Sequence, residues 1–185
     1  MISLKSIASP VGNLVIGTTE IGICFLDFED NVEKYNKLSI LSDSLNQSYQ
    51  FVKSNIILDD CIDQLKQYFN GNRLIFEIPL DYNGTEFQKE VWKQLLLIPY
   101  GSTSTYKDIA DQINQTRTEM AKTSPRAVGN ANGSNRINII IPCHRVIAST
   151  GKLGGYGGGI DRKQLLLRLE RNQSNNRFTI SSLGF

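Results

Sequence analysis

Ile141-Pro142-Cys143-His144-Arg145-Val146 is the stretch that decides how this 185-residue chain is interpreted. It places the only histidine directly after a cysteine, at the end of an apolar run over residues 137–141. A thiol is a useful nucleophile only as the thiolate, and a neighbouring imidazole lowers the thiol pKa toward that state. A free cysteine is also commonly a buried structural thiol, so the pair alone leaves both interpretations open.

The residues before this stretch predict a helical region. Thr85 and Gln88 form a capping-box pattern at the start of one amphipathic helix. A second helix is expected from Thr105, and Ser124-Pro125 predicts the start of a third, made of small residues. This succession is typical of a helix-turn-helix DNA-binding unit, although many enzymes contain similar helical pairs.

Residues 1–80 predict a separate α/β domain. Alternating apolar residues with intervening turns indicate three early strands, and residues 74–78 are expected to form another. A short helix is expected from Asp59, whereas residues 31–57 predict a loop and a poorly defined helix. Residues 81–84 are the expected linker to the helical region.

Charge divides the chain into two unequal halves. Through Asn83, six Lys and Arg oppose eleven Asp and Glu, whereas from Gly84 onward fourteen oppose seven. The net charges are −5 and +7, and a basic half is typical of a domain that meets a polyanion. A chance division of surface charge is the alternative.

Composition also limits the cellular setting. No apolar stretch approaches the ~18 residues of a membrane span, and the first residues predict no secretory signal. Three cysteines without paired spacing argue against a disulfide framework. They favour a reducing, cytoplasmic location.

Strings of residues between positions 85 and 171 resemble the O6-alkylguanine-DNA alkyltransferase domain. The strings are Phe87-x-x-x-Val91-Trp92, Ile98-Pro99-Tyr100-Gly101, Thr105-Tyr106, Arg126-Ala127-Val128-Gly129, Ala131-Asn132-Gly133-Ser134-Asn135, the Cys143 motif, Gly151-x-Leu153-x-Gly155-Tyr156-x-Gly158-Gly159 and Lys163-x-x-Leu166-Leu167-x-x-Glu170. Over residues 1–80 the chain is compatible with the ribonuclease-H-like domain of that family. The resemblance implies an α/β N-terminal domain with a small antiparallel sheet plus helix. A mainly α, winged-helix-like domain over residues 85–171 would follow, and then a tail over residues 172–185.

The resemblance implies direct-reversal DNA repair. Such a protein binds duplex DNA through the minor groove, rotates an O6-alkylguanine out of the stack and moves the alkyl group to its own cysteine, here Cys143. The resulting thioether has no good leaving group, so each molecule is expected to act once. We expect a monomer that needs no cofactor, no membrane and no metal, since Cys24 and Cys61 have no spare histidine to join them.

The resemblance also assigns roles around Cys143. His144 accepts the thiol proton through a water, Glu170 orients the imidazole, and Asn135 braces the motif. Tyr106 donates to O6 of the leaving guanine. The further residues that it implies are Arg126, Ala127, Gly129, Lys107 and Ser149 for DNA, and Val146, Tyr156 and Gly157 for the base. Arg126 would fill the space of the flipped base, and Arg145 would be structural.

Two other protein classes remain open as alternatives, and the chain departs from the family pattern in two places. A related protein that senses alkylated DNA without repairing it has the same fold but replaces the cysteine. A cysteine hydrolase or thiol peroxidase would leave Arg126-Ala127-Val128-Gly129 and the basic half unexplained. Residues 115–120 lengthen the turn of the helix-turn-helix relative to many relatives, and Gly157 stands where some carry serine. The glycine-rich residues 154–159 follow no predicted strand, so we expect a mobile lid over the base and no phosphate site.

Overall fold

Three strands near the N-terminus pair as the alternating apolar pattern predicts. β1 (Ile2–Ile7) pairs antiparallel with β2 (Leu14–Thr18), which pairs antiparallel with β3 (Ile23–Phe28). A fourth strand, β4 (Tyr49–Phe51), lies parallel to β1 at the other edge. The sheet is therefore mixed and not antiparallel, because the chain reaches β4 through helix α1 (Lys34–Leu45) and returns in the direction of β1.

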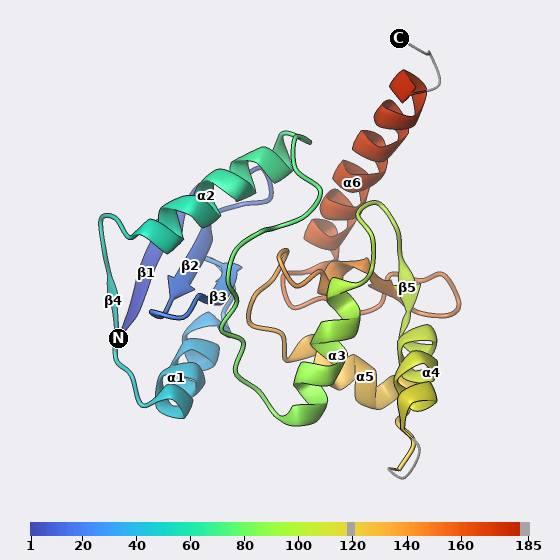
Figure 1. Cartoon of the computed structure of the whole chain (residues 1–185), viewed down its shortest axis with the longest axis horizontal. Helices are drawn as coiled ribbons and strands as arrows, with labels where there is room; N and C mark the ends of the chain where they lie inside the picture. The colour runs from blue at the N-terminus through green and yellow to red at the C-terminus, as the bar shows by residue number, and fades with distance from the viewer. Residues whose placement is uncertain (118–120, 182–185) are drawn as a thin grey trace.

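The sheet lies between two helices (Figure 1). Helix α2 (Ile56–Phe69) covers the face that carries Ile16, and α1 covers the face that carries Val15. Burial on both faces explains why β2 and β3 are almost continuously apolar. Helix α2 begins before the predicted Asp59, because the Asn55 side chain caps it by accepting two backbone N–H groups.

Two expectations about the N-terminal domain are wrong. Residues 74–78 form no strand; only Leu80 bridges to Ile23 of β3, and Ile75 is 73% exposed. The apolar residues of this segment line a groove instead of pairing, which is why their pattern misleads. Residues 31–57 contain α1, which agrees with the poorly defined helix expected there, but they also contain β4, where the weak periodicity predicted loop.

The C-terminal domain contains α3 (Glu86–Leu96), α4 (Tyr106–Thr116) and α5 (Pro125–Gly133). Each of these helices begins at its predicted cap, with capping boxes on the first two. The buried Trp92 of α3 donates its Nε1–H to the carbonyl of Ala131 at 2.8 Å. This hydrogen bond fixes α5 against α3, so α3 supports the helix pair α4 and α5.

The rest of the domain surrounds the cysteine motif. Two short parallel strands, β5 (Ser104–Thr105) and β6 (Val146–Ile147), precede the long helix α6 (Ile160–Ser181). This computed structural model describes residues 1–117 and 121–181, with side chains through residue 173. The expected tail is thus helical as far as Ser181, and part of the extra turn (residues 118–120) lies outside the described residues. No helix in the described part is long and apolar enough to cross a membrane.

The edge of β3 joins the two domains. Ile23 exchanges backbone hydrogen bonds with residues 79 and 81. Farther along the same strand, the Leu26 N–H donates to the Arg136 carbonyl at 2.8 Å, and the Asn138 N–H donates to the Leu26 carbonyl at 2.9 Å. The segment that leads to Cys143 is therefore attached directly to the N-terminal sheet.

Candidate active site

Cys143 begins a single turn of 3-10 helix, Cys143–Arg145, and lines a cavity of about 330 Å³. The residues before it turn sharply, because the Ile141 N–H donates to the Ile137 carbonyl at 3.0 Å. Within this turn Ile139 has a φ of 72°, a left-handed conformation that costs a β-branched residue energy. The apolar run is thus a tight loop that fixes where the sulfur lies.

The cavity has the size of a small-molecule site, for which about 300–1,000 Å³ is usual. Five residues predicted for the site line it together with Cys143, and these are Tyr106, Gly129, Asn135, Tyr156 and Gly157. Lys37 of α1 adds a cation from the N-terminal domain, which no sequence pattern indicated.

The sulfur of Cys143 has two hydrogen-bond partners. The Asn135 side-chain N–H donates to Sγ at 3.1 Å, and the thiol donates to Oδ1 of Asn138 at 3.4 Å. Burial raises the thiol pKa to about 11, outweighing Asn135 and the positive charge of Lys163, which lower it. The expected lowering of this pKa is therefore wrong for the resting protein, which holds a thiol at neutral pH.

A chain of polar contacts continues from Cys143 into the N-terminal domain. The Asn138 amide donates to Asp27 at 3.0 Å, and Lys37 pairs with the other carboxylate oxygen at 2.9 Å. Asp27 and Asn138 are separated by 111 residues. Sequence reasoning missed these partners because such a separation leaves no local signal.

His144 and Glu170 form a fully buried pair. Nε2 of His144 lies 2.8 Å from Oε1 of Glu170. A carboxylate only accepts, so Nε2 carries the proton and Nδ1 is the basic nitrogen. Nδ1 has no hydrogen-bond partner in the described part of the chain. Burial lowers the His144 pKa, which makes the neutral imidazole the resting form.

Glu170 lies on the core side of α6, as its spacing to Leu166 predicts. Arg145 donates to both of its oxygens, at 2.9 and 3.0 Å, and the Gly101 N–H donates at 3.1 Å. Burial alone would raise the Glu170 pKa, but hydrogen bonds from His144 and Arg145 outweigh it and hold that pKa at about 2. Glu170 is therefore an ionised anchor for the imidazole. Arg145 is buried, and its role is structural because it holds the Glu170 carboxylate in place.

Two tyrosines face the sulfur. Tyr106 begins α4, and burial followed by the proximity of Cys143 raises its pKa, so the phenol remains a proton donor. The Tyr156 ring lies edge-on to that of His144, with centroids 6.5 Å apart. A side chain on Gly129 would meet the Tyr106 ring at 3.8 Å, so the small helix α5 lies beside the phenol.

Lys163 ties the glycine-rich loop to the cysteine motif. Its fully buried Nζ donates to the Val146 carbonyl at 2.6 Å and also to those of Leu153 and Gly155. Burial lowers the Lys163 pKa to about 8. The Val146 carbonyl, expected to bind the base, therefore already has one donor.

Of the residues predicted for DNA, Gly129 lines the cavity at Cys143, and the other four lie apart from the reacting cluster. Arg126 at the start of α5, Lys107 on α4 and Ser149 after β6 are exposed, and Ala127 is half-buried. None of them takes part in the hydrogen bonds around Cys143.

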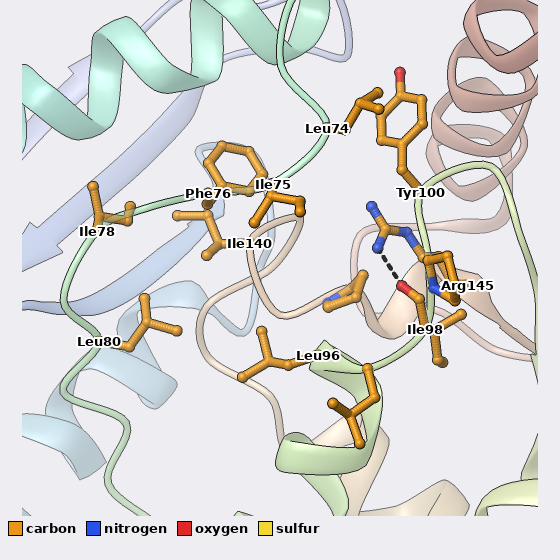
Figure 2. A pocket seen from close by; sticks show the side chains of 13 residues that line it. Leu74, Ile75, Phe76, Ile78, Leu80, Leu96, Ile98, Tyr100, Ile140 and Arg145 are labelled. Carbon is orange, nitrogen blue, oxygen red and sulfur yellow. Dashed lines mark hydrogen bonds between the residues drawn. The ribbon is translucent and has the colours of Figure 1, made fainter.

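A second hollow, the apolar groove, has a volume of about 380 Å³. Figure 2 shows it between the 74–80 segment and the end of α3, with Arg145 at one end donating to the Ile98 carbonyl. Its lining residues include no thiol, imidazole or carboxylate. The cavity at Cys143 is therefore the chemically equipped one.

The other two cysteines do not meet. Cys24 lies in the core on the α1 side of the sheet, and Cys61 lies on the α2 side. Within the described residues, no three His, Cys, Asp or Glu side chains form a metal-binding group.

Comparisons with known proteins match both domains. Residues 3–82 match the model of the 6-O-methylguanine DNA methyltransferase ribonuclease-like domain, and residues 86–172 match that of the DNA binding domain. A methylated-DNA--protein-cysteine methyltransferase of Mycolicibacterium paratuberculosis is 39% identical over 97% of this chain and 99% of its own length. That of Mycobacterium bovis is 53% identical over 64% of this chain and 68% of its own length.

The fold agrees with solved structures. Mycobacterium tuberculosis OGT, crystallised in complex with DNA, superposes with a TM-score of 0.77 at 40% identity, covering 92% of this chain and 94% of that one. The likeness thus covers both domains together. The chain belongs to the 6-O-methylguanine DNA methyltransferase family, the methylated-DNA–protein-cysteine methyltransferases that repair DNA by direct transfer of the alkyl group to a cysteine.

Proposed function

We propose that this protein binds double-stranded DNA containing O6-alkylguanine and transfers the alkyl group to Cys143 in one irreversible step. The observation that carries the proposal is that Cys143 lines a cavity together with the Tyr106 phenol. In the same 3-10 turn, His144 follows Cys143 directly and forms a buried pair with Glu170.

The reaction follows from the protonation states. The sulfur attacks the alkyl carbon while the C–O6 bond breaks, and the thiol proton moves to Nδ1 of His144. In this proposal a water carries the proton from Sγ to Nδ1, which has no hydrogen-bond partner among the described residues. Tyr106 donates to the guanine oxygen as it leaves. Because the resting thiol pKa is about 11, proton removal accompanies the attack.

The DNA surface is built around α5. Gly129 and Ala127 give this helix little bulk, which suits close approach to the minor groove. Arg126 is exposed at its first turn and fills the stack when the base leaves. Lys107 and Ser149 contact the sugar-phosphate backbone of the DNA. Only an extruded guanine reaches the sulfur, since the cavity lies behind α5 and the glycine-rich loop.

We propose a monomer that works in the reducing cytoplasm, where Cys143 stays free. A sensing role without repair is the second candidate, but the retained thiol and its polar partners favour transfer.

The test is incubation with a duplex that contains one O6-methylguanine. We expect one methyl group on the Cys143 peptide by mass spectrometry and one repaired base per protein molecule. Cys143→Ala is expected to bind the duplex without repairing it. Repeated turnover would contradict irreversible transfer, and methylation elsewhere would exclude Cys143 as the acceptor.

A further inference from the structure

The N-terminal domain also supplies a hydrogen bond to the carboxylate of Glu170. The hydroxyl of Tyr68, on α2, donates to Oε1 of Glu170 at 2.7 Å across a separation of 102 residues. The same oxygen accepts the Nε2–H of His144 at 2.8 Å. Arg145 donates to this oxygen as well, at 2.9 Å, so the hydroxyl of Tyr68 and the imidazole of His144 share its lone pairs with a guanidinium.

Packing holds the Tyr68 side chain in place next to Glu170. Tyr68 is fully buried, and its ring contacts those of Phe76 and Tyr100 with centroids 5.3 and 5.7 Å apart. At the end of α2, Gly71 packs so closely on α6 that a Cβ would come within 2.2 Å of the Gln173 side chain. Helix α2 is thus fixed against the helix that carries Glu170.

The hydroxyl remains a donor at every working pH. Burial, and then the negative charge of Glu170, raise the Tyr68 pKa well above its ordinary value. Each donor on a carboxylate oxygen reduces the electron density available to the others. A tyrosine bond to Oε1 therefore weakens the pull of Glu170 on the His144 Nε2–H.

We propose that Tyr68 is a positioning residue of the repair reaction, which holds Glu170 in place and limits how basic the carboxylate makes His144. The inference rests on the proposed function for its effect on rate. Its effect on the imidazole is independent of that function. The other titratable groups near the pair and Tyr68 are Arg145 on the motif, Lys163 on α6, Tyr100 after α3 and Tyr156 in the glycine-rich loop.

The experiment compares Tyr68→Phe with the control Tyr82→Phe in the full chain. Tyr82 packs edge-on against Trp92, away from Glu170, so its variant controls for loss of a half-buried hydroxyl. His144 is the sole histidine, so a chain with labelled histidine gives one imidazole spectrum. We expect the Nε2–H resonance of Tyr68→Phe to move downfield. We also expect His144 to titrate at higher pH and the acid limb of the transfer rate to move by the same amount.

An unchanged His144 spectrum in Tyr68→Phe would overturn the proposal. If that variant does not fold, site-specific replacement of Tyr68 by difluorotyrosine retains the ring and strengthens the donor. The Nε2–H resonance is then expected upfield, and no shift would overturn the proposal equally.

The two hypotheses fail in different ways. If the His144 resonance shifts in Tyr68→Phe but the wild-type protein transfers no alkyl group, the proposed function is rejected and the role of Tyr68 is kept. Normal alkyl transfer with unchanged spectra would reject the role of Tyr68 alone.

Discussion

The side chain of Asn135 bridges the Cys143 sulfur and the backbone of the turn before it. Its Nδ2 lies 3.1 Å from Sγ and 2.9 Å from the Ile141 carbonyl, while its Oδ1 accepts the Ile137 N–H at 2.9 Å. The amide orientation is fixed by these partners, so an N–H always points at the sulfur. The bond becomes charge-assisted when the sulfur ionises, which is when it stabilises most.

Asn135→Ala is expected to slow alkyl transfer about ten-fold, the value of one hydrogen bond to a charged group. The Cys143 pKa should rise, because the interaction that lowers it is lost while burial remains. The measurement is the single-turnover rate on an O6-methylguanine duplex as a function of pH. Asn130→Ala, an exposed position on α5, is the control. An unchanged pH profile in Asn135→Ala would show that the amide only supports the turn.

Arg126→Ala tests the base-replacement role. The exposed guanidinium at the start of α5 lies outside the reacting cluster, so its loss leaves the chemistry intact. We expect repair of duplex DNA to slow at least about ten-fold, since unstacking costs a few kcal/mol. The reaction with free O6-benzylguanine should be unchanged. Lys122→Ala, also exposed, controls for loss of one positive charge. Equal losses on duplex and free base would rule out a role in flipping.

The parts that sequence predicted are those with local signals. The caps Thr85, Thr105 and Ser124 each accept a backbone N–H from the third residue after them, so a short stretch of sequence is enough to predict them. His144 adjoins Cys143, and the burial of Glu170 followed from helical spacing within α6.

The parts that sequence missed depend on distant contacts. Tyr68 reads as an ordinary core residue of α2, and only the folded chain brings its hydroxyl to Glu170. The thiol pKa was misjudged for a related reason. The adjacent imidazole is visible in sequence, whereas the burial that raises the pKa is contributed by both domains.

Trp92→Phe is expected to loosen the packing of α5 on α3. The variant leaves the Ala131 carbonyl without its donor and opens a small cavity, which together cost about 2–3 kcal/mol of unfolding free energy. Urea denaturation measures this loss. It is followed by circular dichroism and not by fluorescence, because the variant removes the only tryptophan. Tyr82→Phe, whose ring packs on Trp92, is the control that retains the bond to Ala131. A loss below about 0.5 kcal/mol, the usual surface effect, would mean that α5 is held by other contacts.

Alkaline pH should destabilise the protein through its buried thiols. Burial raises the pKa of Cys143 to about 11 and those of Cys24 and Cys61 to about 12. Unfolded thiols ionise near pH ~8.5, so above that pH the unfolded chain binds fewer protons than the native one. The stability from these thiols is present in full below pH ~8.5 and is lost as pH rises toward 11 and beyond. Lys163, with a pKa lowered to about 8, acts in the opposite direction but is one group against three.

Methylation of Cys143 provides a matched comparison for this pH dependence. The thioether cannot ionise, so the repaired form should lose stability less steeply between pH 9 and 11 than the thiol form. Cys24→Ala should also make the loss of stability with pH less steep, because it removes a second buried thiol, in the core on the α1 side of the sheet. Urea midpoints at several pH values measure both slopes. Equal slopes for the methylated and free forms would mean that the Cys143 thiol ionises as readily in the native protein as in the unfolded chain. The native pKa of Cys143 would then lie near ~8.5 and not about 11, and burial would not be what holds the resting sulfur as a thiol.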